Sequence, residues 1–365
     1  MAEKTSLFDL VVPEAMAAYY EKMRSNDVPM FGLTCFPNKS KTGLRLDFIK
    51  GYDSLPVMLT PSAFDAKPTI RAREGIELES TKMPFFRESM HITEEDRQNL
   101  LMFSEMNNGN SYASEIIRRI FDDTKALIDG ANIVPEVMRM GLLTAGQFSI
   151  GTTDTNRAMT ATYTYNYDPD GTWAASNVVQ VTSTDTWDKT ETANPVQDII
   201  DVKRKAAAKG VNLTRMVVSP QTWGYLIENQ IIKKNMFLIG NLVTQATPTV
   251  VNDMMVKNYI KNATGVTVIV YDKQYKDYEG AEKSFYPDKF ATLLPDSAVG
   301  STWYGTTPEA ADLRSGRVDA EVKILDSGIA LCTKKESLPV NIITWVSEIV
   351  LPSFENMNRV YNIKW

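Results

Sequence analysis

The residue types that most often carry catalysis or bind metals are few in this chain and far apart. Its single histidine, His91, would have to serve any Ser-His-Asp triad or multi-histidine metal site alone. Cys35 and Cys332 lie near opposite ends of the chain, and no further cysteine exists to complete a metal knuckle or a redox pair. We therefore interpret the histidine as structural and the cysteines as buried thiols, and we assign no catalytic residue.

The acidic residues also lack the arrangement of a reaction centre or a metal site. Glu94–Glu95 and Asp122–Asp123 are neighbours on predicted helices, where successive side chains point about 100° apart and do not converge on one atom. The Asp-Pro-Asp-Gly segment 168–171 lacks the remaining ligands and the terminal glutamate of a calcium loop. No glycine-rich phosphate loop follows a predicted strand. The sequence therefore predicts no metal, no cofactor and no nucleotide.

The composition and the net negative charge favour a folded, acidic protein that does not bind nucleic acid through a basic surface. The chain has 365 residues, 43% hydrophobic and 23% charged, which suffices for at least one substantial core. Its net charge of -6 argues against a surface built to hold phosphate backbones, whereas an acidic container wall would repel enclosed DNA mildly. We find neither a signal peptide nor the apolar run of roughly 18 residues that a membrane helix needs. We therefore expect the protein to be made and used in a cytoplasm, without a membrane partner.

The N-terminal part predicts a helix followed by a long ribbon. Apolar spacing over residues 7–23 is typical of an amphipathic helix, whose apolar face is covered either by the chain's own core or by a neighbouring subunit. Alternating residues over 42–50 and 76–83 predict two strands, and prolines and glycines between them break any longer element. A two-stranded ribbon buries too little apolar surface to be stable alone. We therefore expect it to lie on another copy of the protein.

The next part of the chain predicts helices. Thr93, followed by three acidic residues, is typical of a helix N-cap, so a helical region begins there. After a break at 107–110, an apolar stripe predicts a helix that ends at Gly130. A shorter helix is expected over 135–143, ending near Gly146.

The second half predicts a mixed α+β domain. Alternating tyrosines before Asp168 predict a β-hairpin that turns at 168–171. A helix over 195–209 closed by Gly210, and another capped by Ser219, alternate with strands. The predicted strands cover residues 216–218, 266–271, 290–294, 322–325, 329–333 and 342–351.

Short stretches along nearly the whole chain, in their order and spacing, carry a resemblance to a known family. The most specific stretch is Tyr304-Gly305-Thr306-Thr307-Pro308-Glu309. The others are Gly43 to Gly51, Leu55 to Val57, Pro61 to Asp65, Met83 to Glu88, Glu94 to Gln98, Asn132 to Arg139, Phe285 to Asp288, Leu293 to Pro295, Gly328 to Ala330, Pro339 to Asn341 and Val350 to Glu355. Together they resemble the lambda-like phage major capsid proteins, the E family, with the Hong Kong 97-type capsid fold.

The resemblance implies an α+β subunit of a phage head and a division of the chain into five parts. The expected parts are an N-terminal arm (1–35), an extended loop (36–90), a peripheral domain on a long spine helix (91–193), an axial domain (194–316) and strands that return through both domains (317–365). Copies would form hexamers and pentamers of an icosahedral shell around double-stranded DNA, without sequence-specific binding. Because arm and loop take up the residues before the long helix, we expect a separate scaffolding protein, besides a portal and a decoration protein.

The residues expected to contact neighbouring subunits lie on the first helix, on the ribbon and at nearby basic positions. They are Phe8, Tyr19, Tyr20, Leu44, Leu46, Phe48, Arg71, Arg73 and Arg87. No wider basic patch surrounds Arg71 and Arg73, so carboxylates at subunit contacts are their expected partners rather than DNA. Alanine at Leu46 or Phe48 is expected to impair assembly more than folding.

Other classes of protein fit less well. An encapsulin-like compartment would place the same fold around a cargo enzyme, and the E-family stretches favour the phage shell over it. The missing histidines, phosphate loop and metal ligands disfavour an enzyme, and the long helix before an α+β domain disfavours a tail or decoration protein. An isopeptide crosslink through Lys39, Lys41 or Lys50 is not expected, because the lambda-like branch usually uses decoration proteins instead.

Overall fold

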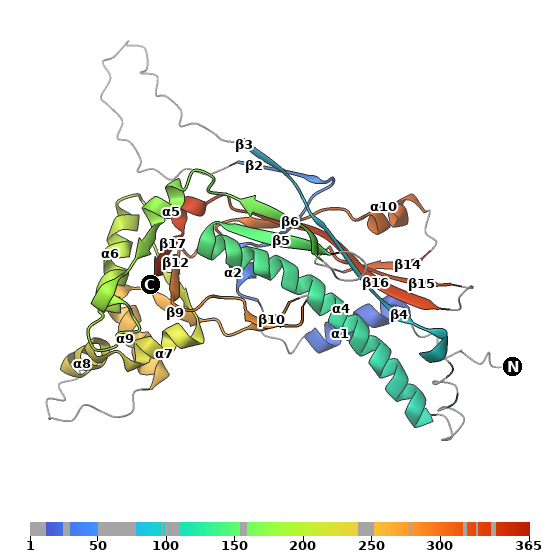
Figure 1. Cartoon of the computed structure of the whole chain (residues 1–365), viewed down its shortest axis with the longest axis horizontal. Coiled ribbons are helices and arrows are strands. Elements are labelled where there is room, and N and C mark those ends of the chain that lie inside the picture. The colour runs from blue at the N-terminus through green and yellow to red at the C-terminus, as the bar shows by residue number, and fades with distance from the viewer. Residues whose placement is uncertain are drawn as a thin grey trace, which may run out of the picture.

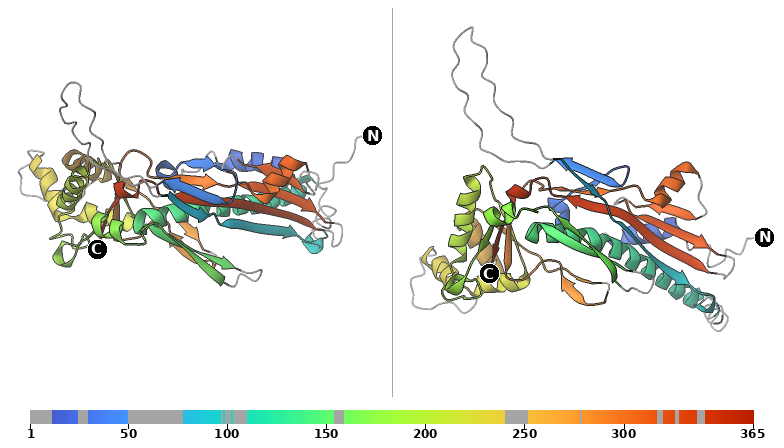
Figure 2. Two further views of the ribbon diagram at one scale, coloured as in Figure 1. Left: turned by 90° about the horizontal axis from the view of Figure 1, so that it is seen from above. Right: turned by 45° about the horizontal axis from the view of Figure 1, so that its top comes forward.

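The structure, a computed structural model, is elongated (Figure 1). A small sheet with several helices forms one end, and a long sheet beside a long helix extends to the other; Figure 2 shows the same arrangement from two further directions. The structure describes residues 12–24, 30–49, 78–96, 98, 102, 110–153, 159–239, 252–277, 279–316, 320–325, 328–336 and 341–365.

The elements of this described part alternate between helices and strands along the chain. The helices are α1 (Pro13–Arg24), α2 (Gly32–Cys35), α4 (Asn110–Ala145), α5 (Thr172–Asn177), η2 (Ser183–Asp185), α6 (Pro195–Ala207), α7 (Pro220–Glu228), α8 (Gln230–Ile239), α9 (Asp253–Thr264), α10 (Pro308–Ser315) and η3 (Met357–Arg359). The strands are β1 (Asn38–Ser40), β2 (Arg45–Ile49), β3 (Leu78–Lys82), β4 (Phe85–Ile92), β5 (Gln147–Thr153), β6 (Met159–Asn166), β7 (Val178–Gln180), β8 (Arg215–Val218), β9 (Thr267–Val270), β10 (Gln274–Lys276), β11 (Glu282–Ser284), β12 (Phe290–Leu294), β13 (Ser301–Tyr304), β14 (Glu321–Ile324), β15 (Ala330–Lys335), β16 (Ile342–Ser353) and β17 (Tyr361–Lys364).

The long sheet is built around β16, a strand of 12 residues. Its described strands follow the order β1-β13-β16-β15-β14, and β4 also pairs with β16. Residues 342–347 of β16 lie between β15 and β4, whereas residues 350–353 pair with β13. Helix α4 packs against β16 and β4. The strands predicted over 322–325, 329–333 and 342–351 are thus confirmed as β14, β15 and β16.

Helix α4 runs unbroken for 36 residues through Gly130 and Pro135, so the prediction of two helices separated at Gly130 is wrong. Tertiary packing is the physical reason, because Ile128 before the proline and Leu142 after it are both fully buried. An interior proline costs about 3 kcal/mol or more. Each large apolar side chain buried along this stripe contributes about 1.5–3 kcal/mol, so the stripe as a whole outweighs the proline. The helix ends at Ala145, just before the left-handed Gly146, as predicted.

The smaller sheet has five described strands in the order β7-β17-β12-β8-β9, and helices α6 to α9 lie around it (Figure 1). Trp187, Ile199 and Leu226 belong to its buried core. The helix predicted over 195–209 is observed as α6. The predicted cap at Ser219 is confirmed, because its Oγ accepts a hydrogen bond from the backbone N–H of Thr222 at 3.2 Å.

The hairpin of β5 and β6 turns at a different place from the predicted one. β5 ends at Thr153 and pairs with β6, which begins at Met159, so the connection between them precedes the predicted turn at 168–171. Asp168 instead precedes α5, and its carboxylate accepts hydrogen bonds from the backbone N–H groups of Trp173 (3.0 Å) and Ala174 (2.9 Å). Aspartate favours helix starts as well as turns, because its short carboxylate satisfies nearby N–H groups in both. The predicted turn at 168–171 is itself present, since the backbone N–H of Gly171 donates to Asp168 O at 3.1 Å, but it leads into α5 and does not close the hairpin.

A buried ion pair on α4 joins segments that are distant in sequence. Arg139 Nη1 donates to Glu136 Oε2 at 3.2 Å, and the two side chains are 2% and 0% exposed. Glu136 Oε1 also accepts hydrogen bonds from the backbone N–H of Gly32 at 2.9 Å and from the hydroxyl of Tyr271 at 2.8 Å. The carboxylate therefore fastens α2 and the segment after β9 to the long helix.

Arg139 extends this network to the long sheet. Its Nε donates to Thr302 Oγ1 on β13 and its Nη2 donates to Asn38 Oδ1 on β1, both at 2.8 Å. A buried charge is stable only when it is paired and hydrogen-bonded. The network of Glu136 and Arg139 therefore makes the positions of α2, α4, β1 and β13 depend on one another.

We expect Arg139→Met to lower the free energy of unfolding by about 3–5 kcal/mol, because it leaves the Glu136 carboxylate buried without its charged partner. The double variant Glu136→Gln/Arg139→Met should recover part of that loss. Chemical denaturation of the unassembled chain, followed by circular dichroism, measures both. As a control, Arg204→Met removes an ion pair whose arginine is 73% exposed and should cost less than about 1 kcal/mol. Equal effects at the two arginines would contradict the prediction.

Candidate inter-subunit surface

The residues with the greatest chemical reactivity occupy structural positions. Cys35 and Cys332 are free buried thiols, as predicted, and burial raises their pKa values to about 11 and about 12. His91 is exposed on β4, with Nε2 3.3 Å from Ser89 Oγ. Across the described residues, no three His, Cys, Asp or Glu side chains gather into a metal site. Nor is any described helix long and apolar enough to cross a membrane.

The apolar face of α1 packs on the chain's own helix α4, which settles the alternative left open by the sequence. The Tyr19 ring lies 5.3 Å from that of Phe121, and its hydroxyl donates to Asp122 Oδ1 at 2.8 Å. Tyr20 is 5% exposed, and its hydroxyl accepts a hydrogen bond from Asn132 Nδ2 at 2.9 Å. Tyr20 thus belongs to the core of its own chain and is not kept among the contact candidates.

The predicted ribbon is confirmed in the described part as the antiparallel pair β2–β3 (Figure 1). Its base is attached to the body, since Leu46 is fully buried in the core and the Tyr165 hydroxyl donates to Lys82 O at 3.3 Å. Leu44, just before the ribbon, is 46% exposed. Of the leucines predicted to contact a neighbour, burial therefore removes Leu46 and leaves Leu44 accessible.

The remaining candidates on the arm and loop are only partly described. The backbone of Phe48 pairs with that of Glu79 in the ribbon. Phe8, Arg71 and Arg73 lie outside the described residues. As inter-subunit contacts these four residues stay predictions.

Arg87 makes its contact within its own chain. Its half-exposed guanidinium pairs with the carboxylate of Glu309 on α10, and its Cζ lies 4.8 Å from the ring centroid of Phe85. Glu309 also accepts hydrogen bonds from Trp345 Nε1 (3.2 Å) and Ser347 Oγ (2.8 Å). Burial raises the pKa of Glu309, but these hydrogen bonds, one from its own backbone and the Arg87 charge together hold it below the usual range. Arg87 thus fastens α10 to the long sheet.

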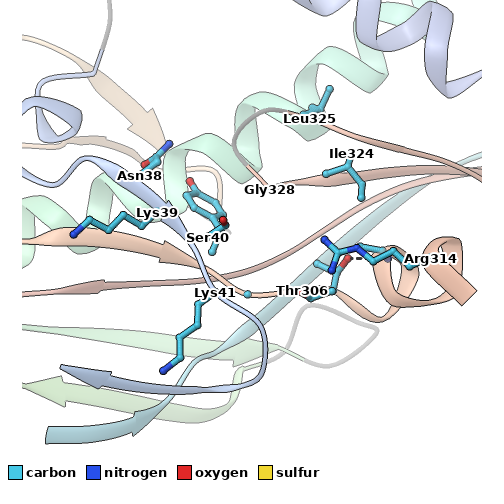
Figure 3. A pocket seen from close by; sticks show the side chains of 13 residues that line it. Asn38, Lys39, Ser40, Lys41, Thr306, Arg314, Ile324, Leu325 and Gly328 are labelled. Carbon is cyan, nitrogen blue, oxygen red and sulfur yellow. Dashed lines mark hydrogen bonds between the residues drawn. The ribbon is translucent and has the colours of Figure 1, made fainter. Parts of the chain in front are cut away.

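A basic hollow of about 340 Å³ lies beside β1 (Figure 3). Three basic side chains and no acidic one are among its described lining residues: Lys39 and Lys41 come from the segment around β1, and Arg314 comes from α10. Lys39 Nζ lies 5.1 Å from the ring centroid of Trp303, and Lys41 Nζ lies 3.5 Å from Asp47 Oδ2. This basic hollow was not predicted from the sequence, although two lysines spaced by two in an extended segment share one face. No sequence signal placed Arg314 beside them.

The chain matches the model of one protein family over most of its length. The family is described as phage major capsid protein E, and the match covers residues 16–326. No curated protein sequence matches the chain.

Solved structures share the fold at low sequence identity. A protein assigned as a prophage capsid protein of Escherichia coli CFT073 is 14% identical, with a TM-score of 0.57 over 97% of this chain and 99% of that one. A capsid chain of cyanophage A-1(L) is 13% identical, with a TM-score of 0.52 over 93% and 92%. A likeness to a virus-like particle from Pyrococcus furiosus has a TM-score of 0.39, too low to carry an argument.

The two leucines of the ribbon should respond differently to alanine. Leu46→Ala should lower the free energy of unfolding by about 2–5 kcal/mol, because it opens a cavity in the core. Leu44→Ala should change it by less than about 0.5 kcal/mol, because the side chain is largely exposed. Denaturant titration of each unassembled variant measures this difference, which corrects the expectation that Leu46 acts mainly on assembly. A fully stable Leu46→Ala chain would contradict the core placement.

Proposed function

Because the chain belongs to the phage major capsid protein E family, we propose that its copies assemble as hexamers and pentamers. The family match over residues 16–326 carries this proposal, and the Hong Kong 97-type capsid fold agrees with it. As a major capsid protein, the chain is a structural subunit of the icosahedral head shell of a tailed double-stranded DNA phage. One surface repeated around five-fold and six-fold axes closes into rings, and rings joined at further symmetry axes close into a shell.

We propose that the chain is divided as the family resemblance implies. The proposed parts are the N-terminal arm 1–35, the extended loop 36–90, the peripheral domain 91–193, the axial domain 194–316 and the returning strands 317–365. The last strands enter both sheets, β16 the long one and β17 the small one, which supports strands shared by two domains. A core around Trp187 and Ile199 is confined to the small sheet and its helices, whereas a second core contains residues of both sheets.

The proposed contacts between neighbouring copies use the ribbon and the basic hollow. Leu44 is exposed where the ribbon begins, and the hollow offers three basic side chains on a chain whose net charge is -6. Acidic side chains of a neighbouring copy are therefore the expected occupants of the hollow. The other proposed contacts, from the arm and loop, remain Phe8, Tyr19, Phe48, Arg71, Arg73 and the half-exposed Arg87.

Other partners are proposed from the family resemblance. A scaffolding protein would set the shell size, a portal would occupy one vertex and a decoration protein would bind the outer surface, all during assembly in the bacterial host cytoplasm. The packing of α1 on α4 supports a separate scaffold, because this helix is held within its own subunit. The acidic net charge supports DNA enclosed without sequence-specific binding. The encapsulin-like alternative is not retained, since the family match is to phage capsid proteins.

Electron microscopy of the expressed chain, with and without neighbouring phage proteins, tests the proposed assembly. We expect thin-walled shells or five-fold and six-fold rings. A chain that stays monomeric or dimeric even with a scaffolding protein supplied would refute the proposed assembly. Shells of correct size from this chain alone would refute the separate scaffold.

The double charge reversal Lys39→Glu/Arg314→Glu should abolish assembly while the unassembled chain keeps its fold, because it repels acidic side chains of a neighbour. Lys39→Arg/Arg314→Lys keeps both charges and serves as the control, with near-normal assembly. Sedimentation velocity measures the shells, and circular dichroism measures the fold. If the reversed variant still assembled normally, the basic hollow would not be a subunit contact.

A further inference from the structure

One buried carboxylate lies outside the networks described above. Glu348 of β16 is 1% exposed, and neither of its carboxylate oxygens has a hydrogen-bond partner among the described residues. An unpaired charge is costly to remove from water, so a buried carboxyl group either takes up a proton or requires a charged partner. Burial raises the pKa of Glu348 well above its usual range, and the charge of Arg139 offsets only part of that effect.

Glu348 lines a recess of about 140 Å³ between α4 and one face of the long sheet. In the β4–β16 register Phe86 lies opposite Glu348 and Glu88 lies opposite Val346, so these four side chains share that face. Opposite them, the recess is lined by the α4 residues Leu127, Gly130, Ala131 and Val134. This Glu348 recess therefore combines apolar walls with carboxylates.

Gly130 contributes to the space in the recess. Apart from its chain neighbours and the backbone of its own helix, no described atom lies within 4 Å of the position that a Cβ on this glycine would occupy. Glycine inside a helix is unfavourable by about 1 kcal/mol relative to alanine. Its presence in the middle of α4 leaves an opening beside the sheet that a larger side chain would narrow.

Two basic side chains of the same chain, Arg87 in the lining of the recess and Arg139, whose charge acts on Glu348, bind other groups. Arg87 lies opposite Ser347 in the register, and both side chains bind Glu309 on the other face of the sheet. Arg139 donates to three side chains of its own network. Neither arginine forms a hydrogen bond with Glu348.

We propose that the Glu348 recess receives a lysine or arginine side chain from a second copy of this chain, which pairs with the Glu348 carboxylate in the assembled shell. The inference rests on the proposed self-assembly and names one contact of it. The apolar walls accommodate the methylene stem of such a side chain, and Glu88 adds a second negative charge at the recess. Every subunit carries this carboxylate, so its partner must be present once per subunit, and another copy fulfils that condition.

The contact couples assembly to a proton. In the unassembled chain burial raises the pKa of Glu348 and so favours its protonated form, whereas an arriving cation favours the ionised form. Assembly then releases a proton from Glu348, so it strengthens as the pH rises toward the raised pKa of this group in the unassembled chain. Within the described part of the chain, the other charged groups around the recess are Glu88 on β4, Arg87 beside it and Arg139 on α4.

The test compares wild-type chain with Glu348→Gln in two states. In the unassembled state the variant should melt about 2 °C or more above the wild type at neutral pH, because it avoids protonating a buried carboxyl group. In assembly, its critical concentration should rise about tenfold, because each subunit loses one ion pair. It should also lose the pH dependence of assembly. Calorimetry and light scattering measure these quantities.

Glu348→Met is a second variant that fills the site without a polar group, and it should behave in the same direction. Glu321→Gln, which removes an exposed carboxylate on β14, is the matched control and should change neither quantity. A Glu348→Gln chain with an unchanged critical concentration would overturn the inference. So would a less stable unassembled variant, because the carboxylate would then already be paired within its own chain.

Two further outcomes separate the inference from the function on which it rests. Wild-type shells together with an unaffected Glu348→Gln variant would refute this contact alone. Absence of shells from the wild-type chain under all assembly conditions would refute the proposed assembly and the contact with it. An effect of the variant seen only with a scaffolding protein present would assign the cation to that protein and overturn the second copy as occupant.

Discussion

The buried pair of Glu136 and Arg139 is the interaction on which the rest of the structure depends. Two charges in the interior are tolerated only when their remaining donors and acceptors are also satisfied. Those partners come from α2, from β1 and β13, and from the segment after β9, so both sheets must be in place around α4. Apolar packing tolerates many exchanges of similar volume. This polar network, by contrast, is complete in one arrangement of the chain.

Three buried carboxylates of the chain differ in their hydrogen-bond partners. Glu136 is satisfied entirely within the subunit, and Glu309 is shared between Arg87 and two donors of β16. Glu348 alone among these three has no hydrogen-bond partner in the described structure. The first two define how a single subunit folds. Glu348 can be stabilised by a partner from outside the described part of its subunit, as expected of a protein that functions as part of a shell.

Local patterns predicted the elements well where one rule dominated, and failed where tertiary packing decided. The preference for serine at helix starts located the cap at Ser219, and the alternation of apolar and polar residues located the ribbon. Gly130 predicted a helix end, but burial of apolar side chains along α4 keeps the helix continuous there. Asp168 stands in a turn and also caps the start of α5, so the residue type alone did not tell that this turn does not join the two strands of a hairpin. Contact residues were harder still. Leu44 and Leu46 share a face and a residue type, and only the fold determines which of them is buried.

The length of β16 has a mechanical consequence for a container filled with DNA. Interstrand hydrogen bonds lie roughly perpendicular to antiparallel strands. Tension directed along β16 would therefore load its bonds to β4, β15 and β13 in shear, sharing the force among many bonds at once. Separating them one after another, as in a zipper, would require a force across the sheet. The orientation of this one strand in the wall thus determines which direction of stretching a subunit resists best.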